Sequence, residues 1–190
     1  WYILIDIEET NQNEETLKSI EDFLFKNLKK NIIKDGLVSK NLKERNELWK
    51  IRESIPYAQK SEGASIKHDI SIPLSNISDF LSISLQKVLE EIPDIRPCIF
   101  GHLGDGNIHF NLTKPRDLND DTFLKFQEKI NKIIYDTVSK YEGSISAEHG
   151  IGLLKNKVIK NYKKHSEIKL MTEIKKIFDS KNILNPGKLI

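Results

Sequence analysis

The segment Gly101–Asn111 (GHLGDGNIHFN) constrains the fold more than any other part of the chain. An Asp-Gly pair lies between two short apolar runs, which is typical of a β-hairpin. If Asp105 and Gly106 are the two central turn residues, His102 lies directly opposite His109 on the neighbouring strand. Opposed residues share one face of a sheet with Cβ atoms roughly 4.5–5.5 Å apart, so two imidazoles in this register could bind one metal ion.

Asn111 lies two positions after His109, so the alternation of side chains along a strand puts both on the same face. A loop longer than two residues would shift the pairing of the strands. The alternative interpretation of this hairpin is two polar histidines on a solvated sheet face.

Hydrophobic periodicity predicts the other elements of the chain. The expected strands cover residues 1–7, 37–39, 65–72, 97–102 and 107–112. The expected helices cover about 15–29, 42–54, 77–92, 121–141, 157–163 and 166–178, the second of them ending before Pro56. Helices that alternate with strands, including a hairpin, favour an α+β fold. We therefore expect an antiparallel sheet covered by helices, as in a ferredoxin-like cap domain, with a helical C-terminal segment.

A second cluster of polar residues lies in the segment Gly143–Gly152 (GSISAEHGIG). Its small residues let the backbone approach a ligand closely, while Glu148 offers a metal ligand and His149 a titratable base. Adjacent side chains of an extended segment point in opposite directions, so both can serve one site only if the backbone bends at the nearby glycines. The alternative interpretation is a flexible loop with a chance Glu-His pair.

Two basic residues are candidates for binding an anionic substrate. Arg52 lies in the segment LWKIRE and Lys67 in the segment KHDISIP. Arginine suits bidentate binding of a carboxylate, and lysine supplies a point charge. Because the chain has 30 basic residues, a solvated surface is the alternative for both. The 28 acidic residues leave a net charge of +2, which gives no reason to expect nucleic acid or an anionic membrane as partner.

Taken together, these segments resemble the C-terminal domain of FAD-linked oxidases of the vanillyl-alcohol-oxidase type. That family includes D-lactate dehydrogenase, the flavin subunit of glycolate oxidase and D-2-hydroxyglutarate dehydrogenase. The matching motifs follow the family order and are LWKIRE, KHDISIP, GHLGDGNIHFN, GSISAEHGIG and, at residues 183–188, ILNPGK. The pair formed by the third and fourth motifs is specific to the family.

The resemblance implies roles for particular residues. The implied ligands of a divalent metal, zinc or else manganese, are His102, His109 and Glu148. The implied catalytic base is His149. The implied substrate-binding residues are Arg52, Lys67 and Asn111, and Asn185 is expected to approach the flavin. One departure is Pro56, since some 2-hydroxyglutarate dehydrogenases carry a hydroxyl side chain at that position, which puts the identity of the substrate in doubt.

The implied activity is FAD-dependent oxidation of D-lactate, glycolate or D-2-hydroxyglutarate to the 2-oxo acid. Residues 1–190 would form the substrate- and metal-binding domain, inactive without the FAD-binding domain that precedes it in the family. No glycine-rich pyrophosphate-binding segment occurs in the sequence. We expect a cytoplasmic protein, or one peripheral to a membrane, and leave a homodimer and the electron acceptor open. The rival functions are a metal-dependent hydrolase and a non-catalytic module that binds a metal or a metabolite.

Overall fold

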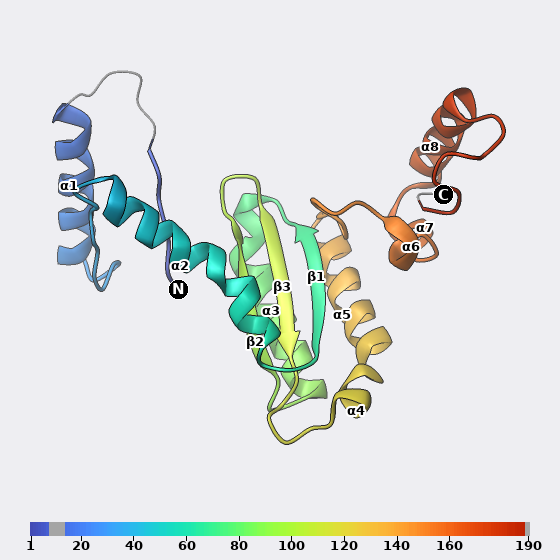
Figure 1. The fold of residues 1–190 in the computed structure, drawn as a ribbon, viewed down its shortest axis with the longest axis horizontal. Helices are drawn as coiled ribbons and strands as arrows, with labels where there is room; N and C mark the ends of the chain where they lie inside the picture. The colour runs from blue at the N-terminus through green and yellow to red at the C-terminus, as the bar shows by residue number, and fades with distance from the viewer. Residues whose placement is uncertain (8–13, 189–190) are drawn as a thin grey trace. The chain divides into compact units, whose positions relative to one another are not determined.

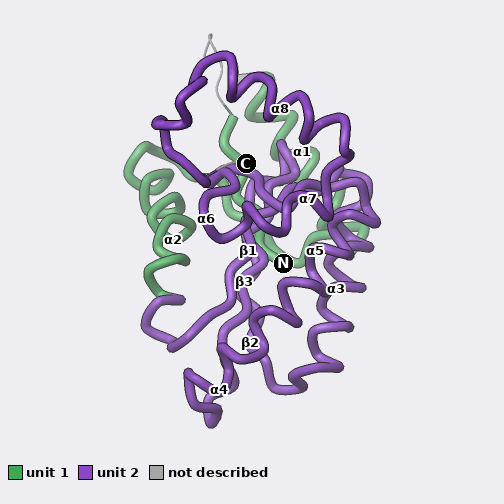
Figure 2. Tube along the Cα trace, turned by 90° about the vertical axis from the view of Figure 1, so that its right-hand side faces the viewer, with its two compact units in different colours: residues 1–58 green, residues 59–190 purple. Residues whose placement is uncertain are grey.

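The computed structural model describes residues 1–7 and 14–188. The chain divides into two compact units, Trp1–Ala58 and Gln59–Ile190 (Figure 2). The first unit contains α1 (Glu14–Lys29) and most of α2 (Leu42–Lys60). The second contains a three-stranded antiparallel sheet and the later helices (Figure 1).

The strands predicted over residues 1–7 and 37–39 are not formed, so both predictions are wrong. A strand requires a partner for its backbone groups, and neither segment pairs with another within the described ranges. The N-terminal segment is anchored through a side chain instead. The Asp6 carboxylate accepts hydrogen bonds from Arg45, at 3.1 Å from Nε, and from Trp49, at 3.0 Å from Nε1.

Helix α2 does not end before Pro56, as the sequence predicts, but continues to Lys60. Proline removes one backbone donor and crowds the preceding turn. The last turn of α2 is nevertheless fixed, because Gln59 is buried and hydrogen-bonded to the sheet. Its Oε1 accepts from Asn111 Nδ2 at 2.9 Å, and its Nε2 donates to Thr113 Oγ1 at 3.1 Å.

The sheet has the strand order β1-β3-β2 and confirms the predicted α+β class. Its elements follow one another as β1 (Ser65–Ser71), η1 (Leu74–Asn76), α3 (Ile77–Glu91), β2 (Arg96–His102), β3 (Asn107–Thr113), α4 (Asp120–Leu124) and α5 (Gln127–Lys140). After α5, Ser144 forms an antiparallel bridge with Ser71 on the free edge of β1. The order β-α-β-β-α, followed by this bridge, is that of a ferredoxin-like unit whose last strand is reduced to one pair.

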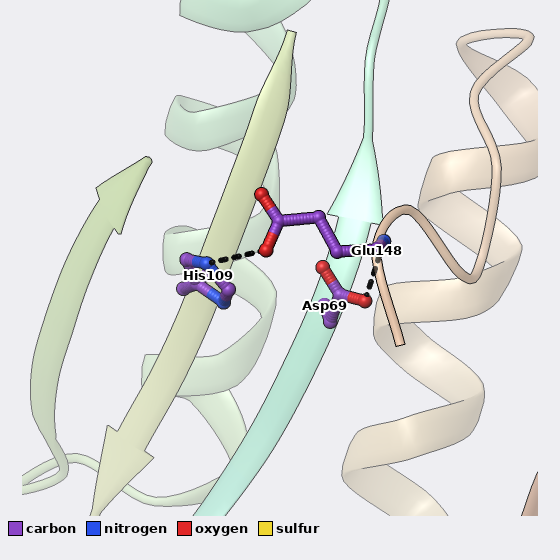
Figure 3. Close-up of side chains that lie close together, drawn as sticks. All are labelled: Asp69, His109 and Glu148. Atoms are coloured by element: carbon purple, nitrogen blue, oxygen red, sulfur yellow. Dashed lines mark hydrogen bonds and ion pairs between the residues drawn. The ribbon is translucent and has the colours of Figure 1, made fainter. Parts of the chain in front are cut away.

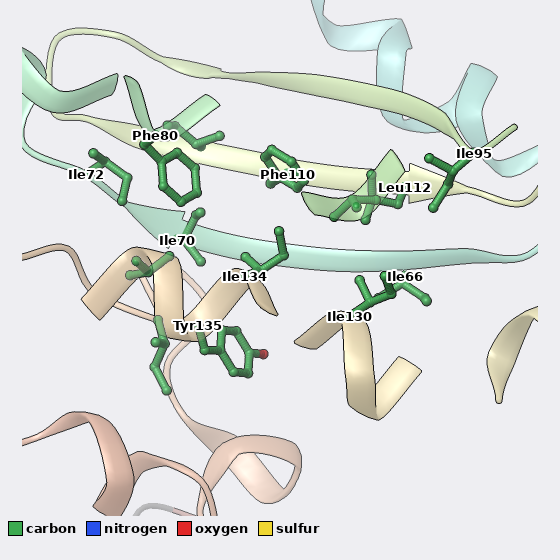
Figure 4. Packing of buried hydrophobic residues seen from close by; sticks show 14 of the residues in the cluster. Ile66, Ile70, Ile72, Phe80, Ile95, Phe110, Leu112, Ile130, Ile134 and Tyr135 are labelled. Atoms are coloured by element: carbon green, nitrogen blue, oxygen red, sulfur yellow. The ribbon is translucent and has the colours of Figure 1, made fainter. Parts of the chain in front are cut away.

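Helices α3 and α5 cover one face of the sheet and close the core (Figure 4). Alternate residues of β1 and β3 point into it, among them Ile70 and Phe110. Phe80 of α3 and Ile134 of α5 meet them and are fully buried. The opposite face of the sheet is thereby left to the polar residues of the same strands.

His68 is the one titratable side chain in the apolar layer of β1. Its ring lies between Phe110 and Tyr135, and its two nitrogens lie 2.9 Å from the Phe110 carbonyl oxygen and from Asn131 Oδ1. Burial disfavours the charged ring and outweighs these hydrogen bonds, lowering the pKa of His68 to about 4. The imidazole is therefore neutral in the folded protein at pH 7.

The free energy of unfolding should consequently decrease by about 2 kcal/mol between pH 7 and pH 5 because of His68 alone. In this range the unfolded chain binds a proton with a pKa near 6.5, whereas the folded chain does not until about pH 4. Urea unfolding at both pH values measures the difference. In His68→Gln, this decrease in the free energy of unfolding should be absent. An equal decrease between pH 7 and pH 5 in the wild type and the variant would contradict a buried, neutral His68 as its cause.

The chain continues through three helices, α6 (Gly152–Lys155), α7 (Ile159–Tyr162) and α8 (His165–Phe178). This confirms the helical C-terminal segment. Tyr162 Oη donates to Asp136 at 2.9 Å and thereby ties α7 to α5. Among the residues with a described position, no helix has the length and apolarity needed to span a bilayer.

Candidate metal and catalytic site

The face of the sheet opposite α3 and α5 carries a cluster of polar side chains from β1 and β3. Lys67 is paired with Asn111, and Asp69 is paired with His109. All four lie on one face because their positions alternate with those of the core residues. Asp69 and Asn111 are buried, whereas Lys67 is exposed. The predicted placement of Asn111 on the face of His109 is confirmed.

The predicted register of the hairpin is wrong. His102 opposes Asn107, and His109 opposes Phe100. The strands are joined by a longer loop, in which Gly106 N donates to Leu103 O at 3.3 Å. The shift is by two positions, so His102 and His109 still share a face, but they are not directly opposed.

The loop between the strands is held by its own residues. Asp105 Oδ1 accepts a hydrogen bond from the Asn107 amide at 2.9 Å, as in an Asx-turn. Gly106 has a φ of 75°, and a Cβ built there would lie 2.2 Å from the Ile72 carbonyl oxygen. A two-residue turn at Asp105 and Gly106 is therefore replaced by a loop packed against the end of β1.

The segment 143–152 crosses the edge of the sheet and bends onto its polar face. Ser144 is bonded to Ser71 through both backbone groups, at 2.8 and 3.0 Å. Ala147 N then donates to Asp69 O at 3.3 Å. Beyond this point Gly150 and Gly152 adopt φ values of 71° and 58°, which favour glycine. The bend that brings both side chains to one site lies at residues 147–149, directly before these glycines.

Three ligand groups meet where this segment lies over the sheet (Figure 3). Asp69, His109 and Glu148 each offer one ligand atom, all within 4.8 Å of one another. His109 Nε2 lies 3.8 Å from Glu148 Oε2. Two residues predicted as metal ligands are thereby brought together, whereas the third, His102, is exposed and is not a member of this group.

The side chain of His149 faces the same group of residues as that of Glu148, although adjacent side chains of an extended segment point in opposite directions. Its ring centroid is 5.9 Å from that of His109, and its Nδ1 is 3.5 Å from Asp69 Oδ2. The side chain is 69% exposed, so it can reach a ligand bound above the sheet. The arrangement places a potential base beside a group of potential metal ligands.

Asp69 was missed as a site residue, although it lies within the segment KHDISIP. The alternation of β1 could have indicated it, because Asp69 follows Lys67 by two positions. Burial opposes ionisation of its carboxyl, but hydrogen bonds from the amides of His149 and Glu148 and from the Asn107 side chain outweigh this effect and hold its pKa below the usual value. The site therefore carries a buried carboxylate at neutral pH.

The remaining predicted residues lie on other elements. Arg52 lies in α2, within the first unit. Asn185 follows α8 in the tail, with a φ of 46°, and its carbonyl oxygen accepts from Lys188 N at 3.3 Å. Their roles stay predictions.

The comparisons with known proteins agree on one family. The profile of the family described as FAD linked oxidases, C-terminal domain, matches residues 1–189. The whole chain is 35% identical to a D-2-hydroxyglutarate dehydrogenase of Stutzerimonas stutzeri (strain A1501), covering 40% of that protein. It is 37% identical to the mitochondrial D-2-hydroxyglutarate dehydrogenase of Arabidopsis thaliana, covering 32% of it. A D-2-hydroxyglutarate–pyruvate transhydrogenase of Saccharomyces cerevisiae is 32% identical over all of the chain, which covers 38% of that protein. The chain thus spans about a third of the length of these relatives.

Proposed function

The chain belongs to the family of FAD-linked oxidase C-terminal domains, and from this we infer that it is the substrate- and metal-binding part of an FAD-dependent dehydrogenase of D-2-hydroxy acids. The observation that carries the proposal is the meeting of His109, Glu148 and His149 over one face of the sheet. The names of the relatives, which act on D-2-hydroxyglutarate, support this class of substrate.

We assign the divalent cation to His102, His109 and Glu148. A set of two imidazoles and one carboxylate suits zinc, and manganese is the alternative. Asn107, directly opposite His102, supports including this histidine. Asn107 Oδ1 is buried and accepts no hydrogen bond from the described part of the chain. Histidine ligands commonly donate their second ring N–H to such an acceptor, so an inward-turned His102 would satisfy it.

The other residues of the polar face would hold the substrate. Lys67 offers an ammonium group to the carboxylate of a 2-hydroxy acid, and Asn111 offers an amide beside it. Arg52, which lies in the first unit, is also proposed to bind a carboxylate group of the substrate. With the substrate bound, neutral His149 would take the proton of the 2-hydroxyl group.

The metal and FAD would supply the Lewis acid and the hydride acceptor, which protein side chains cannot provide. Bound metal would act as a Lewis acid at the substrate oxygens, and bound FAD would accept the C2 hydrogen as hydride. We assign the binding of FAD to the FAD-binding domain of the family, with Asn185 approaching it.

The proposal is tested by mixing the FAD-containing enzyme with single enantiomers of lactate and 2-hydroxyglutarate, and with achiral glycolate. We expect bleaching of the oxidised flavin and one equivalent of 2-oxo acid with a D-enantiomer, or glyoxylate from glycolate. The L-enantiomers are the matched controls and should leave the flavin oxidised. Hydrolytic activity of the metal-loaded chain without flavin, and no flavin reduction by any of these acids, would favour a metal-dependent hydrolase instead.

A further inference from the structure

Asp69 accepts hydrogen bonds from three backbone amides of the segment 143–152, which a residue that only binds a metal would not need. It is 5% exposed. Its Oδ2 accepts from the amides of Glu148 at 2.9 Å and of His149 at 2.8 Å. Its Oδ1 accepts from Asn107 Nδ2 at 3.0 Å. Its backbone carbonyl oxygen accepts from Ala147 N at 3.3 Å. One residue of β1 therefore holds three consecutive amides of the segment.

Lys155 adds a second set of hydrogen bonds to the same segment. Its ammonium group is half-buried and donates to the carbonyl oxygen of Ile145 at 2.8 Å and to Ser146 Oγ at 3.3 Å. It also reaches the carbonyl oxygen of Asp69 at 3.4 Å. The segment is thus held by a cation at the Ile145 carbonyl oxygen and the Ser146 hydroxyl group. It is held by a carboxylate at the amides of Glu148 and His149.

We propose that Asp69 is a positioning residue, which sets the backbone of Glu148 and His149 so that both side chains face the bound metal and substrate. This inference rests on the proposed function. Adjacent residues of a regular strand would point to opposite sides. Here two consecutive amides turn toward one carboxylate oxygen, and this turn lets both side chains serve one site.

The same contacts argue against Asp69 as a metal ligand, although it lies within the group of ligand atoms. Its Oδ2 already accepts two hydrogen bonds, from the amides of Glu148 and His149, and its Oδ1 accepts one, from Asn107 Nδ2. A cation bound to Oδ2 would compete with the amides of Glu148 and His149 for the same lone pairs. Loss of these bonds would release the segment that supplies the other ligand.

The test uses Asp69→Ala, Asp69→Asn and, as a matched control at an exposed aspartate of α3, Asp79→Ala. Amide hydrogen exchange is followed by NMR in the metal-free protein, and zinc affinity is measured by competition with a chelating dye. In Asp69→Ala we expect exchange at Glu148 and His149 to accelerate at least about tenfold and zinc affinity to fall about 10- to 100-fold. Amides of the core strand β3 should keep their protection, as all should in the control.

The Asp69→Asn variant distinguishes a positioning role of Asp69 from a role as metal ligand. With Asn at position 69, the side-chain oxygen can still accept from both amides, and only the hydrogen bond with Asn107 Nδ2 is lost. Asp69→Asn should therefore recover most of the protection and of the zinc affinity. A neutral amide is a poor substitute for a carboxylate ligand, so zinc affinity as low as that of His109→Ala would overturn the proposal.

Unchanged hydrogen exchange at the amides of Glu148 and His149 in Asp69→Ala would also overturn the proposal that Asp69 is a positioning residue. If the alanine variant does not fold, zinc binding by the asparagine variant decides alone. These readings do not depend on turnover. Normal positioning by Asp69, together with no flavin reduction by any 2-hydroxy acid, would refute the proposed function and leave the positioning contacts in place.

Discussion

Replacing His149 with alanine should lower the turnover number of the FAD-containing enzyme about 10²- to 10⁴-fold, the range typical of a lost general base. His149 lies beside His109, and its side chain is largely exposed toward the space above the polar sheet face. The substrate would still be held by Lys67, Asn111 and the metal. The Michaelis constant should therefore change much less than the turnover number, since proton removal is needed only in the reaction itself.

Steady-state kinetics with the best D-2-hydroxy acid measure both constants. His165→Ala is the matched control, because His165 is an exposed histidine at the start of α8 and outside the proposed site. It should keep wild-type turnover. Wild-type turnover in His149→Ala would remove His149 from the mechanism, and an equal loss in His165→Ala would show that the effect is not specific to the site.

Several features of the fold could be predicted because they depend on local patterns. The strand predicted over residues 65–72 has isoleucine at 66, 70 and 72 in alternation with polar residues and stops before Pro73; it forms as Ser65–Ser71. The hairpin strands and α3 likewise agree with their expected positions within one or two residues. The alternation along β3 was enough to place His109 and Asn111 on one face, whatever the register.

Features that depend on distant contacts were predicted less well. The register of the hairpin depends on the packing of Gly106 against Ile72, which the Asp-Gly signal does not include. The prediction that α2 ends before Pro56 considered proline alone, whereas buried hydrogen bonds of Gln59 fix the last turn. The importance of Asp69 follows from a segment almost eighty positions later in the chain, so no local pattern could reveal its partners.

Removing two of the proposed metal ligands should abolish metal binding. In the double variant His109→Ala/Glu148→Gln, the site loses an imidazole nitrogen and its carboxylate, whose ligand atoms lie 3.8 Å apart. His102 alone would then be left of the proposed set, and one imidazole does not hold zinc against solvent. The matched control is His165→Ala/Glu173→Gln, which removes the same two groups from exposed positions of α8. The single variant His102→Ala tests the third ligand and should also lower zinc affinity.

The measurement that tests the central claim most directly is the metal content of the purified protein and of these variants by plasma mass spectrometry. The proposed site predicts about one equivalent of zinc or manganese in the wild type and in the α8 control, and none in His109→Ala/Glu148→Gln. Metal retained by that double variant, or no metal in the wild type after incubation with Zn²⁺ and Mn²⁺, would contradict a metal site on the polar face of the sheet.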